Sequence, residues 1–410
     1  MGREPGRGSL DTTGARPRSW LRSRAKSWAQ NLSLLLLGSV LALVLLESSL
    51  RLFRNPFGFR VRGDRIVLPV HRRYEIHNTR IPKLDGVIVH TKNSLGFRGP
   101  EPPERFRDHL TLLTVGGSTT ECFYLGDGDT WTDRLGHRLG ENFENTWINN
   151  AGLDGTSTFG HIVLMQDHVS RLRPKVAVFL VGLNDQGRDD LRREDRVILR
   201  SPSGGADRIE DWALGRSESV ALVLNLKRYL QTRNREVDDH TSIDVRDLPA
   251  RTVAESDIER LKQRHRSQHL DLYRERLERL VEVTRAGGTE PVLVTQPVVH
   301  GSGIDPSTGV DLGLMAVGKW NGRTQWEVLE LYNGVTRAVG ATNGVLVVDL
   351  ASKLEKDSRY FYDFTHYTKE GARRVADVIY GDLCGWLEAR FPEFVARPCR
   401  EHGSSGPPTP

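Results

Sequence analysis

The chain has 410 residues, and 38% of them are hydrophobic, which is enough to build one large folded domain with additions. Its formal net charge of +5 resides in residues 1–30, where Arg and Lys outnumber Asp and Glu, so the rest of the chain is neutral. A neutral chain without interleaved basic and aromatic residues does not match the pattern of proteins that bind phosphate backbones. We therefore expect no nucleic acid among its partners.

An uncharged segment follows the basic tail. Residues 27–46 contain no charged side chain, and most of them are apolar. As a helix, this segment would span roughly 30 Å, the thickness of one hydrocarbon core. A cleaved signal peptide has a similar pattern, but Glu47-Ser48-Ser49-Leu50-Arg51 lacks the small-residue pair that a signal peptidase requires. We expect a basic cytoplasmic tail at 1–26, a retained transmembrane signal anchor at 27–48, and the remaining chain outside the cytoplasm.

The chain beyond this segment divides into three parts. We expect a membrane-proximal linker region at 49–105, a large domain at 106–390 and a disordered tail at 391–410, which ends in a run of Gly, Ser and Pro. The linker region contains aromatic residues that could rest at the membrane interface, but packing on the large domain fits the sequence equally well.

Short apolar runs alternate with helical patterns in the large domain, which is typical of βαβ units and a parallel sheet. We expect strands at 110–115, 146–150, 176–181, 291–295 and 345–348. We expect the main helices at 159–172, 258–285, 325–339 and 369–387. The pattern predicts an α/β fold with a doubly wound, five-stranded parallel sheet.

Two regions interrupt this alternation after predicted strands. Residues 186–250 are rich in charge and contain one amphipathic stretch at 220–226, and residues 300–320 are rich in glycine. Long loops at the carboxyl edge of a sheet are candidate lids or substrate walls, although a disordered insertion explains the first region equally well.

The chain has three cysteines, Cys122, Cys384 and Cys399, whose spacing fits neither a metal site nor an even disulfide framework. Cys384 and Cys399 could pair outside the cytoplasm, but free thiols fit the count as well. Cys122 follows closely after a serine motif, and we interpret it as a small buried helix residue rather than a nucleophile.

A glycine turn ends the first predicted strand and delivers Ser118 to the start of a helix. Gly117 allows a substrate to approach closely, and the free N–H groups of a helix start can hold a developing oxyanion. This location suits a nucleophile. A phosphate site or a simple helix cap would fit the same turn.

Two further motifs follow the second and third strands, at the same predicted edge of the sheet as Ser118. They are Asn150-Ala151-Gly152 and Gly182-Leu183-Asn184-Asp185. The backbone N–H of Gly152 and the side-chain amide of Asn184 could join the N–H of Ser118 as a three-donor oxyanion hole. Each motif taken singly would be interpreted as a turn.

The fourth motif, Asp363-Phe364-Thr365-His366, lies between the last strand and the closing helix, for which Thr368 is a plausible N-cap. Because Asp363 and His366 are three residues apart on one loop, the carboxylate can orient the imidazole and stabilise its charged form. Four motifs in order, each behind a strand of one sheet, indicate nucleophilic catalysis with Ser118 as nucleophile and His366 with Asp363 as its activating pair.

These four motifs resemble the blocks of the SGNH hydrolases, also called GDSL-type esterases, and the resemblance covers residues 106–390. It implies a three-layer α/β/α flavodoxin-like fold, no metal or organic cofactor, and an ester or thioester substrate. Gly117 stands where many members have Asp. The segment Asn93-Ser94-Leu95-Gly96-Phe97-Arg98-Gly99 also resembles one that precedes the catalytic domain in membrane-tethered members.

We expect a membrane-anchored serine esterase that acts through an acyl-enzyme, with a carbohydrate ester or another small acyl ester as substrate. An O-acyltransferase would use the same residues and pass the acyl group to a sugar hydroxyl. A lipase or thioesterase is a further alternative, because the stretch at 220–226 would suit a lipid-facing lid. A surface-binding module that has lost activity is a lesser one.

Overall fold

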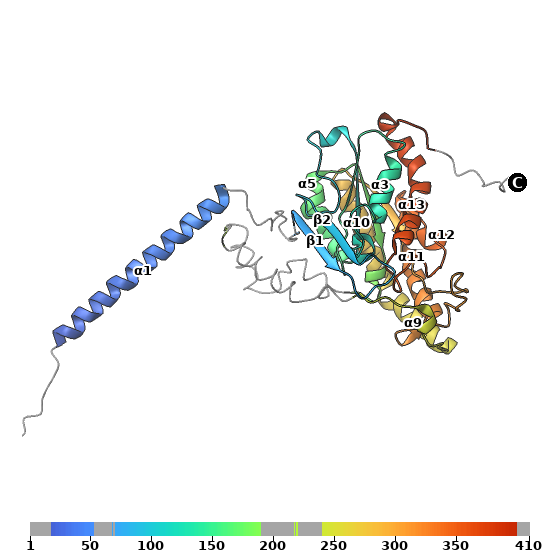
Figure 1. Cartoon of the computed structure of the whole chain (residues 1–410), viewed down its shortest axis with the longest axis horizontal. Coiled ribbons are helices and arrows are strands. Elements are labelled where there is room, and N and C mark those ends of the chain that lie inside the picture. Colours follow the sequence, from blue (N-terminus) through green and yellow to red (C-terminus); the bar gives the residue numbers. More distant parts are fainter. Residues whose placement is uncertain are drawn as a thin grey trace, which may run out of the picture.

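The computed structural model describes residues 18–52, 68, 70–189, 217, 219 and 240–399. Most of the region predicted to be an insertion or lid at 186–250 lies outside these residues, and so does the chain beyond 399. The described part between residues 106 and 390 is an α/β unit built on one central sheet (Figure 1).

The central sheet has five parallel strands, which confirms the sequence prediction. The strands are β3 (Leu110–Gly116), β4 (Thr146–Asn150), β5 (Val176–Val181), β6 (Glu290–Thr295) and β9 (Leu346–Val348). Their spatial order is β4-β3-β5-β6-β9. The order reverses direction between β3 and β5, and doubly wound sheets bind ligands at such a point, beyond the carboxyl ends of the strands.

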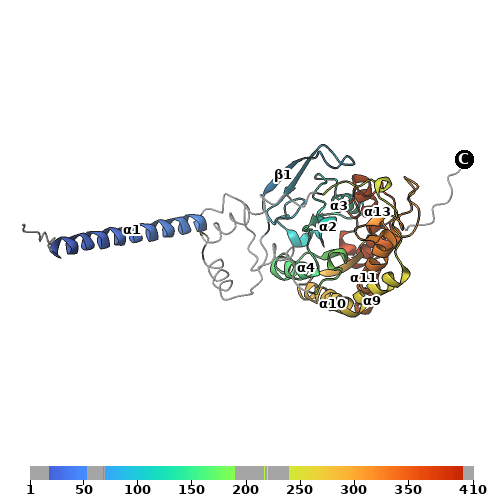
Figure 2. The same ribbon diagram turned by 90° about the horizontal axis from the view of Figure 1, so that it is seen from below.

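Alternate residues of the strands point to opposite faces, and each face is covered by helices, which gives three layers. On β3, Leu110 and Leu112 belong to one buried cluster, and Leu113 and Val115 belong to the other. The first cluster packs against α3 (Trp131–Leu139) and α13 (Lys369–Arg390). The second packs against α4 (Thr158–Leu164), α10 (Leu270–Ala286) and α11 (Gly322–Asn343), as Figures 1 and 2 show.

Two predicted helices are interrupted in the structure. The helix expected at 258–285 is α9 (Glu255–Gln268) followed by α10, with a break at His269, where φ is −128°. The helix expected at 159–172 begins as α4, continues as a π-helical turn at Met165–Val169 and ends as α5 (Ser170–Leu172). Neither interruption contains Pro or Gly, so the helical periodicity gives no sign of it.

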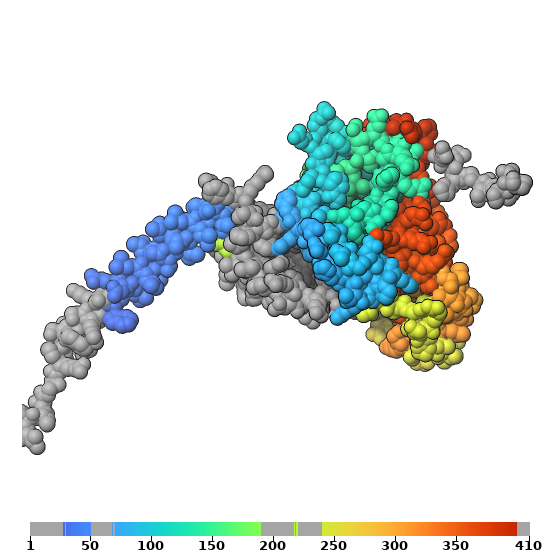
Figure 3. Space-filling model, viewed as in Figure 1, coloured from blue at the N-terminus to red at the C-terminus, as the bar shows by residue number. Residues whose placement is uncertain are grey.

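Part of the predicted linker region packs on the large domain. Strands β1 (Arg72–His77) and β2 (Val87–Lys92) form an antiparallel hairpin. After the hairpin, Arg98 pairs with Asn150 on the edge strand β4, so the chain extends the edge of the central sheet. The hairpin forms a continuous part of the domain surface in Figure 3.

Residues 391–399 are folded onto the domain, whereas the sequence predicts a disordered tail from residue 391 onward. A short 3₁₀ helix at Pro392–Phe394 buries the ring of Phe394, and a disulfide joins Cys384 of α13 to Cys399. An apolar ring and a covalent link hold this segment on the domain. Cys122 is a free, buried thiol.

The N-terminal helix α1 (Arg18–Leu52) contains one segment, Gln30–Leu50, whose length and apolar composition suit a membrane span. Its large apolar side chains are exposed, and α1 projects away from the domain (Figures 1 and 3). A helix of this kind close to the N-terminus has the composition of a membrane anchor and also that of a signal sequence.

Candidate active site

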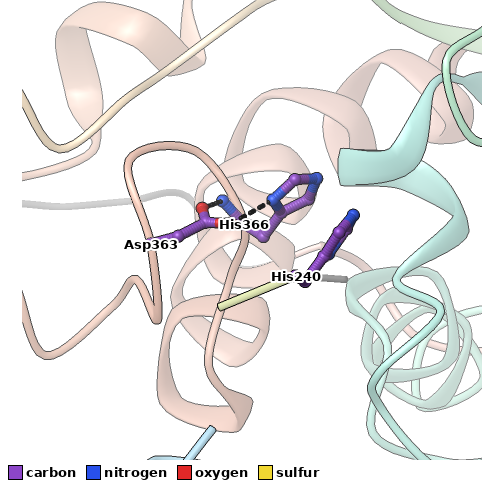
Figure 4. Close-up of side chains that lie close together, drawn as sticks. All are labelled: His240, Asp363 and His366. Carbon is purple, nitrogen blue, oxygen red and sulfur yellow. Dashed lines mark hydrogen bonds and ion pairs between the residues drawn. The ribbon is translucent and has the colours of Figure 1, made fainter. Parts of the chain in front are cut away.

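Ser118, His366 and Asp363 meet at the carboxyl edge of the sheet although they come from distant parts of the chain. Ser118 begins the one-turn helix α2 (Ser118–Glu121) directly after β3. Its Oγ lies 2.7 Å from His366 Nε2, and His366 Nδ1 lies 2.7 Å from Asp363 Oδ2. Figure 4 shows the Asp363 carboxylate facing the His366 ring. The three side chains form a continuous hydrogen-bonded chain from carboxylate to hydroxyl.

The Asp363 carboxylate is fixed by its own loop. Its Oδ1 accepts the backbone N–H groups of Thr365 and His366, each at 2.8 Å. Burial raises the pKa of this carboxyl group, but the hydrogen bond and charge of His366, together with the two backbone donors, outweigh burial. The pKa of Asp363 therefore lies below its ordinary value, and the group stays ionised at neutral pH.

The loop that carries Asp363 and His366 is closed at both ends. The Tyr362 N–H donates to the His366 carbonyl at 2.9 Å, and Phe361 pairs with Tyr367 across the loop. The Thr368 hydroxyl accepts the Gly371 N–H at 3.1 Å, so Thr368 is the N-cap of α13, as the sequence predicts. Asp363 and His366 are thus held by a short turn anchored to a long helix.

Asn184 lies directly over the turn that carries Ser118. A β-carbon on Gly117 would come within 2.3 Å of Asn184 Nδ2, so glycine leaves the space that this amide occupies. The amide donates one hydrogen to the Thr156 carbonyl at 2.9 Å. An amide nitrogen carries two hydrogens, so one remains available for a substrate oxygen. Within the described residues, the Ser118 N–H also has no hydrogen-bond acceptor.

Gly152 packs against the backbone of α2, but its N–H is engaged. A β-carbon at this position would lie 2.3 Å from the Glu121 nitrogen, so only glycine permits the contact. The Gly152 N–H donates to Asn150 Oδ1 at 2.8 Å, and Asn150 Nδ2 donates to the Thr120 carbonyl at 2.5 Å. An Asx turn therefore uses the donor that the sequence suggested for the oxyanion hole.

The sequence matches the GDSL-like lipase/acylhydrolase family over residues 114–374, which is more than half of the chain. The chain belongs to this family. The match includes all four motifs, from the Ser118 turn to His366. Membership makes the protein an ester hydrolase of the SGNH type, and the observed three-layer fold agrees with it.

Several solved structures are similar to this GDSL-like protein at low identity. An acetylxylan esterase, Axe2 from Geobacillus stearothermophilus, is 15% identical, with 66% of this chain and 93% of that chain covered and a TM-score of 0.37. The protein TesA is 15% identical, with 67% and 97% covered and a TM-score of 0.35. An α/β hydrolase, LAE5 from the metagenome of Lake Arreo, is 14% identical, with 66% and 92% covered and a TM-score of 0.34. No curated protein matches the chain.

His240 lies beside this GDSL-like site and was missed in the sequence. Its ring centroid is 4.1 Å from that of His366, and its Nδ1 lies 2.7 Å from the hydroxyl of Tyr362. Its Nε2 is 3.9 Å from a carboxylate oxygen of Asp154. The ring of Tyr124 is tilted against His240 with centroids 5.1 Å apart. Polar and aromatic side chains therefore border His366, and no local sequence motif indicates them.

His240, Asp363 and His366 are also the one group in the described part of the chain whose ligand atoms lie close enough to hold a metal ion (Figure 4). Both nitrogens of His366 are already engaged, one by Asp363 and the other by Ser118. A metal ion here would have to displace the Ser118 contact, so the arrangement fits proton transfer better than coordination.

Cys122 does not compete with Ser118 as a nucleophile. Burial raises the pKa of the Cys122 thiol to about 12, and the thiol donates to the Thr119 carbonyl at 3.3 Å. A thiol in this state supplies almost no thiolate at neutral pH.

Proposed function

We propose that Ser118 is the nucleophile of an ester hydrolase and that His366 is its general base and acid. Asp363 orients the His366 imidazole and stabilises its charged form. The observation that carries the proposal is the pair of contacts of 2.7 Å that link Ser118 Oγ to His366 Nε2 and His366 Nδ1 to Asp363 Oδ2. An ionised carboxylate on Nδ1 fixes the tautomer in which Nε2 is free to accept a proton.

The reaction runs in two halves. His366 takes the Ser118 proton as Oγ bonds to the acyl carbon, and the carbonyl electron pair moves to oxygen. The tetrahedral intermediate collapses and expels the alcohol, which takes the proton from His366. Water then gives a proton to His366 and attacks the acyl-enzyme, and Ser118 leaves with that proton as the carboxylic acid is released.

The developing oxyanion would be held by two donors, the Ser118 N–H and the second amide hydrogen of Asn184. Each such donor typically contributes about 3–4 kcal/mol to the transition state. The Gly152 N–H becomes a third donor when it shares its hydrogen between the substrate and Asn150 Oδ1, which is a neighbouring acceptor at 2.8 Å.

We propose a polar ester, such as an acetylated carbohydrate, as the substrate at a membrane surface outside the cytoplasm. Support for a polar substrate comes from His240, which lies beside His366, and from Tyr124 and Asp154, which lie beside His240; these side chains bring polar groups and flat rings to this region. Support for the compartment comes from the Cys384–Cys399 disulfide, which persists in oxidising environments. The apolar segment Gln30–Leu50 would be the anchor.

The test is turnover of p-nitrophenyl acetate and of an acetylated xylo-oligosaccharide by the full chain in detergent, with and without an added sugar acceptor. We expect acetate release that Ser118→Ala abolishes and that Ser352→Ala, an exposed serine on α12 (Leu350–Lys353), leaves unchanged. Acetyl transfer to the added sugar in place of acetate release would make the protein an acyltransferase. Turnover that survives Ser118→Ala would remove the assignment of the nucleophile.

A further inference from the structure

Arg98, in the segment that precedes the domain, contacts the nucleophile segment, which we define as residues 118–125. The Arg98 side chain is 1% exposed. Its guanidinium donates to three backbone carbonyls, those of Glu121 at 2.9 Å, Cys122 at 2.7 Å and Leu125 at 2.7 Å. All three acceptors belong to the nucleophile segment. One buried cation therefore holds the residues that follow Ser118 in the sequence.

The Glu121 carbonyl ends a helix that is only one turn long, and the Cys122 carbonyl, which also accepts the Leu125 N–H at 2.9 Å, follows it at the C-cap. The C-cap of α2 is Cys122, which has a left-handed φ of 51°. The last carbonyls of a helix have no intrahelical donors. A guanidinium supplies several donors in a planar fork, and hydrogen bonds from a charged donor are about twice as strong as neutral ones. Arg98 therefore caps the helix whose first residue is the nucleophile.

A buried ion pair adds a second link. Lys92 Nζ at the end of β2 lies 2.8 Å from Glu121 Oε1, and the two side chains are 2% and 9% exposed. The other oxygen of Glu121 accepts the backbone N–H of Asp154 at 2.8 Å. The same carboxylate thus joins the hairpin, the end of α2 and the loop after β4 that contains Gly152.

Asn93 holds Arg98 in place. Its Oδ1 accepts the N–H groups of Leu95 and Phe97 at 3.0 and 3.1 Å, and its Nδ2 donates to Asn149 Oδ1 of β4 at 2.6 Å. The Arg98 backbone then exchanges hydrogen bonds with Asn150 at 2.9 and 2.8 Å. The turn is fastened to the same strand that leads to the Gly152 loop, so its geometry is tied to the active site.

We propose that Arg98 and Lys92 are positioning residues that hold Ser118 and the Gly152 loop in the reactive arrangement, so that residues 72–99 are a working part of the active site. This inference rests on the proposed function of Ser118. It gives a role to the Asn93–Gly99 motif, which lies before the first residue of the family match at 114. A displacement of about 1 Å at a reacting group can cost roughly 10²-fold in rate.

The experiment measures the second-order rate at which a fluorophosphonate labels Ser118 in the full chain, together with kcat and KM for p-nitrophenyl acetate. We expect Arg98→Ala to lower the labelling rate and kcat by roughly 10²-fold with KM little changed. Arg98→Lys keeps the charge but loses the planar fork, so its rates should lie between those of Arg98→Ala and the wild type. Added guanidinium at millimolar concentration should restore part of the rate of Arg98→Ala, and urea should not.

Asn78→Ala is the matched control. Asn78 also bonds to the backbone around the hairpin, through Ile81, Arg80 and Asp85, but it touches no residue of the nucleophile segment. Thermal unfolding of each variant gives its loss of stability. The inference requires the fluorophosphonate to label Asn78→Ala at the wild-type rate. It must label the folded Arg98 variants more slowly. If Arg98→Ala does not fold, the labelling rate of Arg98→Lys, and that of Arg98→Ala refolded with guanidinium, are compared with the wild-type rate instead.

Two results would overturn the inference. Folded Arg98 variants that label as fast as the wild type would leave the proposed function intact and reduce Arg98 to a packing residue. Equal rate losses in Asn78→Ala and the Arg98 variants, in proportion to lost stability, would lead to the same conclusion. A wild-type protein that is folded and does not label would instead contradict the proposed function itself.

Discussion

The side-chain amide of Asn184 occupies the space that a β-carbon at residue 117 would need, since the two positions lie 2.3 Å apart. The residue before Ser118 therefore decides where the proposed oxyanion donor can lie. Many SGNH hydrolases carry Asp before the serine, and this chain carries Gly. The amide in turn donates to the Thr156 carbonyl, which fixes its orientation.

Gly117→Ala should lower kcat because the new methyl group pushes the Asn184 amide away from the oxyanion. We expect a loss of roughly tenfold to a hundredfold, up to the loss of a whole donor, while the fold is kept. Steady-state kinetics on p-nitrophenyl acetate measures it. Gly385→Ala on α13, where a β-carbon meets open space, is the matched control and should keep full activity. An unchanged kcat in Gly117→Ala would show that catalysis does not depend on the observed position of the Asn184 amide.

Asn184→Ala removes the donor altogether. One oxyanion donor is typically worth roughly 10²–10³ in kcat, and we expect a loss in this range with little change in KM. The control Asn343→Ala removes an amide that bonds to a helix carbonyl at the C-terminal end of α11. Turnover equal to that of the wild type in Asn184→Ala would contradict the assignment of this amide to the oxyanion.

Asp363→Asn should leave the loop folded but favour the wrong tautomer of His366, because an amide can donate to Nδ1. We expect kcat to fall by roughly 10⁴, the effect of this change in serine triads. Asp382→Asn, which alters a surface ion pair with Lys353, is the matched control. A loss of less than about tenfold would show that His366 keeps its tautomer without the carboxylate.

The hairpin should loosen in acid because it buries a neutral histidine. His90 is completely buried between Tyr74 and Phe123, and neither of its ring nitrogens has a partner in the part of the chain that the structure describes. Burial, and then the charges of Arg98 and Lys92, lowers the pKa of His90 to about 2. Between that pKa and the ordinary value of 6.5, the unfolded chain binds a proton that the folded chain does not.

Stability should therefore fall as the pH falls below about 6.5, by about 1.4 kcal/mol per pH unit from this one group. His90→Phe keeps an apolar ring and should flatten the dependence between about pH 6.5 and pH 4.5. Chemical unfolding at several pH values measures the free energy of unfolding, with His137→Phe on the exposed face of α3 as control. The same slope in wild type and His90→Phe would show that His90 does not control this transition.

The parts of the fold that could be predicted are those with a strong local pattern. The wholly apolar run at Val176–Val181 is a central strand, as expected, because a strand buried on both faces needs apolar residues throughout. The start of α13 after Thr368 could be predicted because the chemistry of a helix cap is local. Ser118, Asp363 and His366 could be chosen because each follows a strand of the same sheet.

The parts that could not be predicted depend on contacts between distant residues. The segment Arg72–His77 is rich in polar residues and its sequence indicates a linker, since only its pairing with β2 makes it a strand. The motif that contains Arg98 does not reveal its contact with Cys122, and His240 lies in no motif, because their partners are far away in sequence. The engagement of the Gly152 N–H by Asn150 depends on a side-chain rotamer that no pattern specifies.

The most direct test of the account is labelling of the full chain with a fluorophosphonate, followed by intact mass of the wild type and of Ser118→Ala. A serine hydrogen-bonded at 2.7 Å to an oriented histidine should be activated, so we predict one adduct on the wild type and none on the variant. A folded wild type that forms no adduct, or an adduct that persists in Ser118→Ala, would contradict the claim that Ser118 is the activated nucleophile.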